Sequence, residues 1–310
     1  MAEALRWGVL GASSRMYRTR ILGPMQASDR HVVVAEASRD ASGSEQPYAD
    51  LLARPDVDAV YVPLPNLGHK PWVLAALEAG KHVLCEKPLT MSAADTDEVY
   101  EAAASAGRAL VEAYMWPHHP RHQALLDVAR DGLGDLRFAR AAFTFPLRRP
   151  DDHRFDARGR GALFDVGIYC LGPSVLMAPR EPVAVAASAV RNEHGVDVSM
   201  SAWVDLGEGF ATSIEVSFET VNGRSFQLTG TGGRISIPDW FAPGPEEPST
   251  LEVLRLDDSV ERIECAGANA YGQMLDQFAD VVQHAAHPVW GPAESRRLAR
   301  WIDAVQAAAA

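Results

Sequence analysis

A lysine stands where an apolar segment of the chain ends. Residues 82–85 run directly into Glu86, Lys87 and Pro88. If the apolar segment is a strand of a parallel sheet, Lys87 lies at the edge of the sheet where ligands bind. Proline fixes its own φ and permits a cis peptide bond, so it could hold the lysine toward a ligand. The alternative is a surface turn, because most lysines are solvated.

An aspartate and a tyrosine occur four residues apart later in the chain, at Asp165 and Tyr169. Positions i and i+4 lie on one face of a helix, so the two side chains could serve one site if this segment is helical. The alternative is structural: an aspartate that caps the helix and a tyrosine at the edge of the core.

A turn that could bind phosphate follows the first apolar segment. Its residues are Gly11, Ala12, Ser13, Ser14 and Arg15. Dinucleotide-binding folds carry G-x-G-x-x-G at this position, so that backbone N–H groups approach the pyrophosphate. Only the first glycine is present, which leaves an ordinary strand-to-helix turn as the alternative. The small side chains still permit close approach, and Ser14 or Arg15 could reach a phosphate.

The end of the second apolar segment predicts which cofactor is bound. Ser38 and Arg39 stand there, about 20 or more residues after the glycine turn, where the ribose-binding residue is expected. A hydroxyl followed by a guanidinium would accept the 2'-phosphate of NADP(H), whereas a carboxylate at the strand end would repel it. These two residues therefore predict NADP(H). The alternative is NAD, with Glu36 bound to the ribose and Arg39 solvated.

The first part of the chain has the pattern of a doubly wound parallel sheet. Short apolar segments alternate with helical patterns, and they occupy residues 5–10, 32–37, 59–62, 83–85 and 109–113. Residues 99–106 repeat apolar side chains at helical spacing, with Ser92 as N-cap and Gly107 as C-terminal stop. Such sheets bind ligands beyond the carboxyl ends of their strands.

Strands prevail after residue 150. Residues 213–219 alternate apolar and polar side chains. Further strands are expected at residues 138–145, 183–190, 225–229 and 251–256, and two helical patterns close the chain. We expect an α/β protein with a dinucleotide-binding domain at residues 1–120 and a mostly antiparallel sheet domain at residues 121–310. The last helices are candidates to pack back on the first domain.

Composition limits the partners and the location. The chain has 310 residues and a net charge of -12, so neither a nucleic acid nor an anionic membrane is expected as a partner. It has no signal-like start and no run of about 18 apolar residues, which predicts a cytoplasmic protein. Its three cysteines form no C-x-x-C pair, and we expect them to be buried rather than paired or bound to zinc.

Taken together, these motifs resemble the glucose-fructose oxidoreductase and inositol dehydrogenase family, also called Gfo/Idh/MocA. The matching segments are residues 7–12, 37–40, 62–66, 80–89 and 165–169, with Tyr271 and Phe278 in a late helix. The resemblance implies a Rossmann domain followed by an α+β domain with an open-faced, mostly antiparallel sheet, whose open face joins homodimers or homotetramers. Tyrosine rather than histidine at position 169 is similar to the branch of glucose-fructose oxidoreductase, dihydrodiol dehydrogenase and NADP-dependent xylose dehydrogenase, which favours NADP(H).

The resemblance also implies a reaction and the residues that perform it. The reaction is hydride transfer between the nicotinamide and a carbinol or carbonyl carbon of a small polyol-like substrate, which is a sugar, a polyol or a trans-diol. Tyr169 would move the hydroxyl proton, Lys87 would favour its phenolate, and Asp165 would orient the pair. Besides the glycine turn, Ser38 and Arg39, the residues implied in cofactor binding are Pro63, Leu64, Asn66, His69, Glu86 and Lys87.

Departures from the family pattern leave a second hypothesis open. Two glycines of the fingerprint are missing, and Pro117 stands where relatives often have an arginine. A non-catalytic NADP-binding regulatory protein on the same fold would tolerate both changes. A metal site at His118 and His122 is not expected, because Pro117 and Pro120 disrupt helical spacing and no carboxylate or cysteine completes a ligand set. These histidines are expected to line a pocket or the surface.

Overall fold

The computed structural model describes residues 3–149, 151–156, 159–238, 240–241 and 244–310. The chain divides into two compact units, each built on one sheet. The first unit consists of Met1–His118 and Asn269–Ser295, and the second of His119–Ala268 and Arg296–Ala310. Among the helices of the described residues, none is both long and apolar enough to cross a bilayer.

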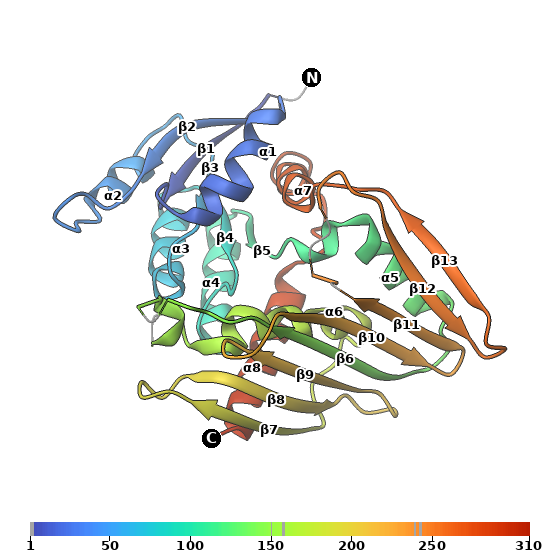
Figure 1. Ribbon diagram of the computed structural model, residues 1–310. Coiled ribbons are helices and arrows are strands. Elements are labelled where there is room, and N and C mark those ends of the chain that lie inside the picture. The colour runs from blue at the N-terminus through green and yellow to red at the C-terminus, as the bar shows by residue number, and fades with distance from the viewer. Residues whose placement is uncertain (1–2, 150, 157–158, 239, 242–243) are drawn as a thin grey trace. The chain divides into compact units, whose positions relative to one another are not determined.

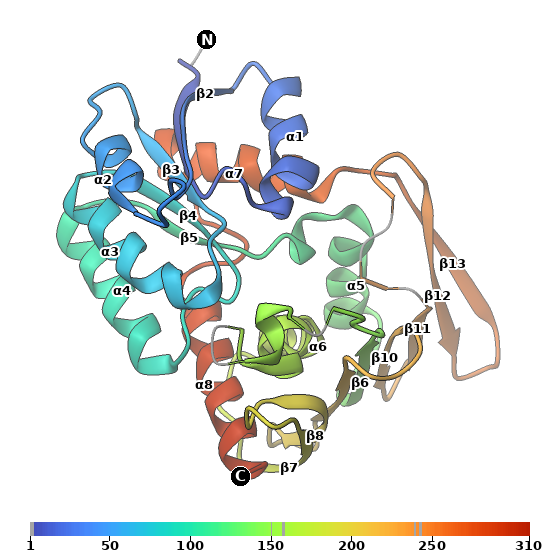
Figure 2. The same ribbon diagram turned by 60° about the vertical axis from the view of Figure 1, so that its left-hand side comes forward.

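The first unit is a five-stranded parallel sheet in the order β2-β1-β3-β4-β5. Its strands are β1 (Leu5–Leu10), β2 (His31–Ala37), β3 (Ala59–Val62), β4 (His82–Glu86) and β5 (Leu110–Ala113). Its helices are α1 (Leu22–Ala27), α2 (Gln46–Leu52), α3 (His69–Glu78), α4 (Ala93–Ala106) and α7 (Ala270–His284), with the short turns η1 (Tyr17–Ile21), η2 (Asn66–Gly68) and η3 (Trp116–His118). Figures 1 and 2 show α2, α3 and α4 on one face of this sheet and α1 and α7 on the other. This arrangement confirms the expected Rossmann-type sheet.

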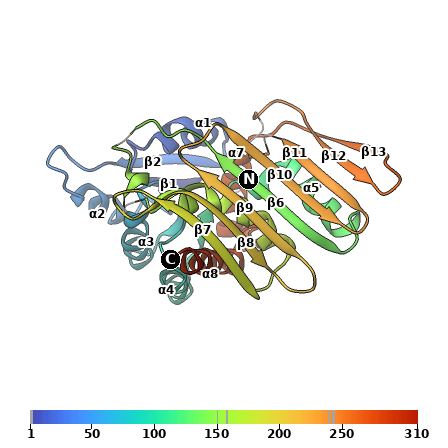
Figure 3. The same cartoon turned by 60° about the horizontal axis from the view of Figure 1, so that its bottom comes forward.

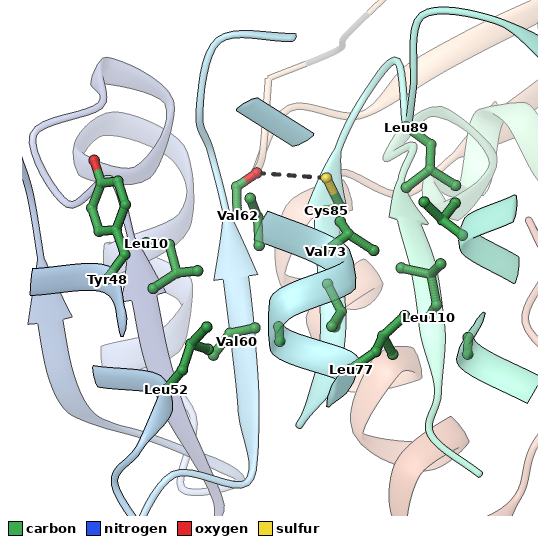
Figure 4. Packing of buried hydrophobic residues seen from close by; sticks show 14 of the residues in the cluster. Leu10, Tyr48, Leu52, Val60, Val62, Val73, Leu77, Cys85, Leu89 and Leu110 are labelled. Atoms are coloured by element: carbon green, nitrogen blue, oxygen red, sulfur yellow. Dashed lines mark hydrogen bonds between the residues drawn. The ribbon is translucent and has the colours of Figure 1, made fainter. Parts of the chain in front are cut away.

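The core of this unit lies between the sheet and its helices. Figure 4 shows Val73 and Leu77 of α3 packed against Val60 and Val62 of β3, with Cys85 of β4 beside them. The ends of α4 follow the expected signals, since the Ser92 side chain accepts a hydrogen bond from the Asp95 N–H and Gly107 has φ 61°. All three cysteines are free and buried, as expected.

The second unit is an eight-stranded sheet in the order β13-β12-β11-β10-β6-β9-β8-β7. It is antiparallel apart from the parallel pair of β6 and β9. Its strands are β6 (Leu136–Thr144), β7 (Ala184–Arg191), β8 (Asp197–Asp205), β9 (Ala211–Ser217), β10 (Gly223–Gly230), β11 (Gly233–Pro238), β12 (Ser249–Arg255) and β13 (Val260–Cys265). The helices are α5 (Pro120–Asp131), α6 (Ile168–Met177) and α8 (Pro292–Ala308), whose first turn belongs to the first unit, with the short turns η4 (His153–Phe155) and η5 (Leu163–Gly167).

The two faces of the eight-stranded sheet differ in exposure. On β6, Ala139 and Ala141 are buried, whereas Phe138 and Arg140, which alternate with them along the strand, are exposed, as expected for a strand with one covered face. Figure 3 shows the strands of this sheet in front of α5, and α6 packs against β6 and β9. The face opposite Ala139 and Ala141 carries exposed aromatic side chains, since Phe138 and Trp203 keep 53% and 45% of their surface exposed. The expected oligomer contact through this face stays a prediction.

Candidate functional site

The chain turns sharply at Gly11, directly after β1. Gly11 has φ 108°, a conformation that glycine adopts without steric cost. The N–H groups of Gly11 and Ala12 donate to the carbonyl oxygen of Ala37 at 2.8 and 2.9 Å. A Cβ atom on Gly11 would lie 2.9 Å from Cδ2 of Leu64. The glycine turn after β1 is therefore hydrogen-bonded to the end of β2 and packs against the loop after β3.

Ser38 links the glycine turn to the end of β2. Its Oγ accepts a hydrogen bond from the Ser13 N–H at 3.0 Å, and Arg39 beside it is exposed. Glu36, the carboxylate of the NAD alternative, accepts a hydrogen bond from the Tyr17 hydroxyl. The groups that directly follow β2 are thus a hydroxyl and a guanidinium, a donor set that suits a phosphate on the ribose.

The loop after β3 contains four of the residues expected to bind cofactor. Pro63 is buried, whereas Leu64 and Asn66 are partly exposed. His69, the first residue of α3, has no exposed surface. Its Nδ1 lies 2.7 Å from the Pro88 carbonyl oxygen and its Nε2 lies 2.8 Å from that of Leu64. The structure therefore places His69 beneath the loops, bound to the backbone, rather than at their surface.

Lys87 directly follows β4 at the carboxyl edge of the sheet. The Lys87–Pro88 peptide bond is cis, the form that the proline permits. The preceding Glu86 is buried and accepts a hydrogen bond from the Tyr61 hydroxyl at 2.7 Å. Burial raises the pKa of Glu86 above its usual range, against the opposing effects of the Tyr61 hydrogen bond and the nearby Lys87 cation. Glu86 and Lys87 are therefore electrostatically coupled.

Asp165 and Tyr169 lie on one continuous helical segment, formed by η5 and α6. This arrangement agrees with the helical spacing expected for them. The Tyr169 ring is buried and packs edge-on against Phe241, with ring centres 4.4 Å apart. Asp165 forms an ion pair with Arg154, whose Nε lies 2.8 Å from Oδ2 of the carboxylate. The helix thus presents an anchored aspartate and a packed tyrosine one turn apart.

Sequence reasoning missed two residues around this helix. Arg154 comes from η4 and also forms an ion pair with Asp152 at 3.1 Å. Asp197 begins β8, and its Oδ2 accepts a hydrogen bond from the Leu163 N–H at 2.8 Å, where the helical segment starts. Arginines near an aspartate are too common in sequences to single out Arg154, and Asp197 lies 34 residues from its partner.

The structure brings the expected cofactor residues of the first unit to one edge of its sheet. They lie at or directly after the carboxyl ends of β1 to β4 and comprise Gly11, Ala12, Ser13, Ser14, Arg15, Ser38, Arg39, Pro63, Leu64, Asn66, Glu86 and Lys87. Asp165 and Tyr169 belong to the second unit. Their pairing with Lys87 stays a prediction.

The histidine cluster after β5 is structural in part. His119 and His122 are buried, and Nε2 of His122 lies 2.9 Å from the Trp240 carbonyl oxygen. The expected surface position is therefore wrong for these two histidines, because the packing of α5 buries them, and the alternative of a pocket lining stays a prediction. Burial lowers the pKa of His118 and of His119 to about 4. Within the described ranges, no three histidine, cysteine, aspartate or glutamate side chains form a group that could hold a metal ion.

Comparison with known protein families decides the assignment. Residues 5–114 match the model of an oxidoreductase family with an NAD-binding Rossmann fold, GFO/IDH/MocA, and residues 123–236 match a C-terminal domain of that family. The chain belongs to the GFO/IDH/MocA family. The expected resemblance is therefore confirmed, together with the expectation of an oxidoreductase that has a Rossmann domain.

Individual members of the GFO/IDH/MocA family match almost the whole chain. A dTDP-3,4-didehydro-2,6-dideoxy-alpha-D-glucose 3-reductase of Streptomyces violaceoruber is 35% identical over 99% of this chain and 96% of its own. An NADP-dependent D-xylose 1-dehydrogenase of Haloferax volcanii is 30% identical over 97% and 96%. A 3-ketoreductase of Actinomadura kijaniata, solved with NADP and TDP-benzene, is 30% identical over 99% and 98%, with a TM-score of 0.88.

Proposed function

We propose that this protein is an NADP(H)-dependent oxidoreductase that transfers hydride between the nicotinamide and a carbinol or carbonyl carbon of a sugar. The proposal rests on the grouping of the expected residues at the carboxyl edge of the five-stranded sheet. There Ser38 contacts the glycine turn, and Lys87 follows the buried Glu86. The relatives that use NADP or were solved with it support the choice of cofactor.

The residues at this edge fit NADP(H). Gly11 provides a turn that a Cβ atom would crowd against Leu64, and the hydroxyl of Ser38 and the guanidinium of Arg39 suit the 2'-phosphate. When bound, the cofactor supplies or accepts the hydride. Glu36 is bound to the Tyr17 hydroxyl, which disfavours the alternative in which it holds the ribose of NAD.

Tyr169 holds and moves the proton at the reacting oxygen in this proposal. A phenol with its usual pKa of about 10 is a poor base at neutral pH, and lowering that value by about three units requires about 4 kcal/mol of differential stabilisation. The ammonium of Lys87 is the cation that would supply it, by favouring the phenolate and by donating to the reacting oxygen. Asp165, anchored by Arg154, would orient the tyrosine or the substrate.

A sugar substrate follows from the relatives in two forms. One group of relatives reduces a nucleotide-activated keto sugar and another oxidises a free aldose. In both reactions hydride moves between the cofactor and one sugar carbon, which is a carbonyl in the oxidised sugar and a carbinol in the reduced one. The shared chemistry is therefore oxidation or reduction at one carbon of a sugar ring.

Turnover with a panel of sugars tests the proposal. Purified protein is incubated with NADP and D-xylose, D-glucose or TDP-D-glucose while the absorbance of the reduced cofactor is followed. We expect turnover to fall by about 100-fold or more in Lys87→Ala and Tyr169→Phe, because each removes a group that acts in the transition state. As a matched control, Lys70→Ala on the surface of α3 should keep activity, because Lys70 pairs with Asp95 instead. Tight NADP binding without turnover of any sugar would overturn the proposal in favour of a regulatory NADP-binding protein.

A further inference from the structure

The buried peptide group between Pro88 and Leu89, which directly follows the Lys87–Pro88 peptide, is held at both of its polar ends. Its carbonyl oxygen belongs to Pro88 and lies 2.7 Å from Nδ1 of His69. Its N–H belongs to Leu89 and donates to Oε1 of Glu112 at 2.9 Å. His69 and Glu112 keep 0% and 4% of their surface exposed, so these contacts form away from water, where hydrogen bonds are stronger.

His69 connects this peptide to the loop after β3. Its second ring nitrogen lies 2.8 Å from the Leu64 carbonyl oxygen. Burial lowers the pKa of His69, whereas the hydrogen bonds to the two carbonyl oxygens, which are both acceptors, oppose this change. Because Leu64 packs against the position of Gly11, His69 lies between the glycine turn and the chain segment of Lys87.

Glu112 connects the same peptide to the late segment of the first unit. Its Oε2 accepts hydrogen bonds from Nε1 of Trp290 at 3.0 Å and from the Ser295 hydroxyl at 2.6 Å. Three donors therefore surround one buried carboxylate on β5. A carboxylate accepts through both oxygens and from several directions, which suits this position between two separate stretches of chain.

The restraint passes to Lys87 through the covalent geometry of Pro88. A peptide unit keeps six atoms in one plane, and the proline ring fixes the dihedral angle φ. When the peptide of Pro88 and Leu89 is held at both ends, the Cα atom of Lys87 has little freedom to move. The Lys87 N–H also lies 3.3 Å from Oε2 of the buried Glu86.

We propose that His69 and Glu112 are positioning residues that hold the Pro88–Leu89 peptide and thereby place the ammonium of Lys87 for the reaction. The inference rests on the proposed function of Lys87. Neither residue touches substrate or cofactor in this scheme, and both act through the backbone.

Kinetics of full-length variants test this role. Glu112→Ala and His69→Leu remove the contacts, whereas Glu112→Gln keeps an oxygen for the Leu89 N–H and His69→Asn keeps a donor for the Pro88 carbonyl. Asp58→Ala is the control, because it removes a carboxylate of the same unit that pairs with Arg6 instead. With NADP and the panel sugar that the wild type oxidises fastest, kcat should fall about 100-fold in the first two variants, as expected for a catalytic group displaced by about 1 Å.

KM and the pH dependence of kcat distinguish a positioning role from loss of the folded state. KM for NADP should change little, and the dependence of kcat on pH should move toward higher pH by about one unit, because a displaced cation favours the phenolate less. His69→Asn should recover most of kcat. Glu112→Gln should recover part of it, because it keeps the acceptor for the Leu89 N–H but not the one for Trp290. Asp58→Ala should leave the pH profile unchanged. Loss of activity in proportion to the unfolded fraction, with an unmoved pH profile, would overturn the inference.

A measurement without turnover distinguishes this inference from the proposed function. Acetic anhydride labels Lys87 in the folded proteins, and mass spectrometry of the Lys87 peptide gives the rate. Glu112→Ala and His69→Leu should raise that rate at least about threefold over the wild type, because hydrogen bonds that hold the backbone are lost, while Asp58→Ala should not. If the wild type oxidises no sugar but the labelling changes as stated, the proposed function fails and the restraint on Lys87 stands. Equal labelling in all proteins would overturn the restraint.

Discussion

Replacing Asp197 with asparagine should alter how the stability of the second unit depends on pH. Asp197 keeps 1% of its surface exposed, and its Oδ2 accepts the hydrogen bond from the Leu163 N–H at 2.8 Å. Gly161 packs so closely that a Cβ atom there would lie 2.7 Å from Oδ1. Asparagine has nearly the same shape and keeps one oxygen for the N–H, but it cannot ionise.

The magnitude follows from the titration of this carboxyl. Burial raises the pKa of Asp197 from 3.8 to about 6, although its backbone N–H partners oppose the change. A carboxyl whose pKa is raised in the folded state contributes stability that is fully present below its unfolded value and is lost as the pH rises through the folded value. The two values correspond to about 3 kcal/mol. The wild type should therefore lose about 3 kcal/mol relative to Asp197→Asn between about pH 4 and pH 7.

Urea unfolding followed by tryptophan fluorescence at several pH values measures this difference. The test uses only how the difference in unfolding free energy between Asp197→Asn and the wild type changes with pH, so that a constant cost of the substitution cancels. Asp58→Asn is the control of opposite sign: the Arg6 hydrogen bond lowers the pKa of Asp58, so its contribution is lost as the pH falls. A difference between Asp197→Asn and the wild type that stays constant to within about 0.5 kcal/mol across this range would refute the reasoning.

Two further predictions concern the cofactor edge. Gly11→Ala should destabilise the protein by about 1 to 3 kcal/mol and weaken NADP binding, because φ is 108° and the new Cβ would lie 2.9 Å from Leu64. The control is Gly23→Ala in α1, where a Cβ meets no atom within 4 Å. Urea unfolding and NADP titration check this, and equal effects at both glycines would contradict it. Arg39→Asp should shift the cofactor preference from NADP to NAD, measured as the ratio of kcat/KM for NADP to kcat/KM for NAD. Undiminished affinity for NADP in that variant would show that the 2'-phosphate is bound elsewhere.

Local patterns in the sequence predicted the first unit well. The five parallel strands occur where apolar segments were expected, because strands covered on both faces leave continuous apolar runs. Ser92 and Gly107 end α4 as expected, since caps are determined by residues within a few positions. In the second unit β8, β11 and β13 were not expected. The side chains of β8 do alternate between buried and more exposed, so that strand could have been found.

The supporting residues of the site could not be predicted from local patterns. The partner of Leu89 is Glu112, 23 positions later, and the partner of Leu163 is Asp197, 34 positions later. Contacts of this kind depend on which strands become neighbours. His69 illustrates the same limit, because its place in the sequence does not reveal that both ring nitrogens lie within 2.8 Å of backbone carbonyl oxygens, while its implied part in cofactor binding stays a prediction.

The buried carboxylates of Glu112 and Asp197 stabilise the backbone in the same way. Glu112 binds the N–H two residues after Lys87, and Asp197 binds the N–H two residues before Asp165. In each unit, an acid on a strand next to a functional segment fixes the backbone of that segment, while the functional side chain itself keeps its polar atoms for other partners. An apolar residue of equal size would leave the N–H unsatisfied at a cost of about 1 to 3 kcal/mol, whereas an amide would satisfy it. Asparagine at position 197 should therefore preserve the fold and the backbone geometry together. Glutamine at position 112 should keep the contact to the Leu89 N–H but lose that to Trp290, and apolar residues at either position should lose both kinds of support.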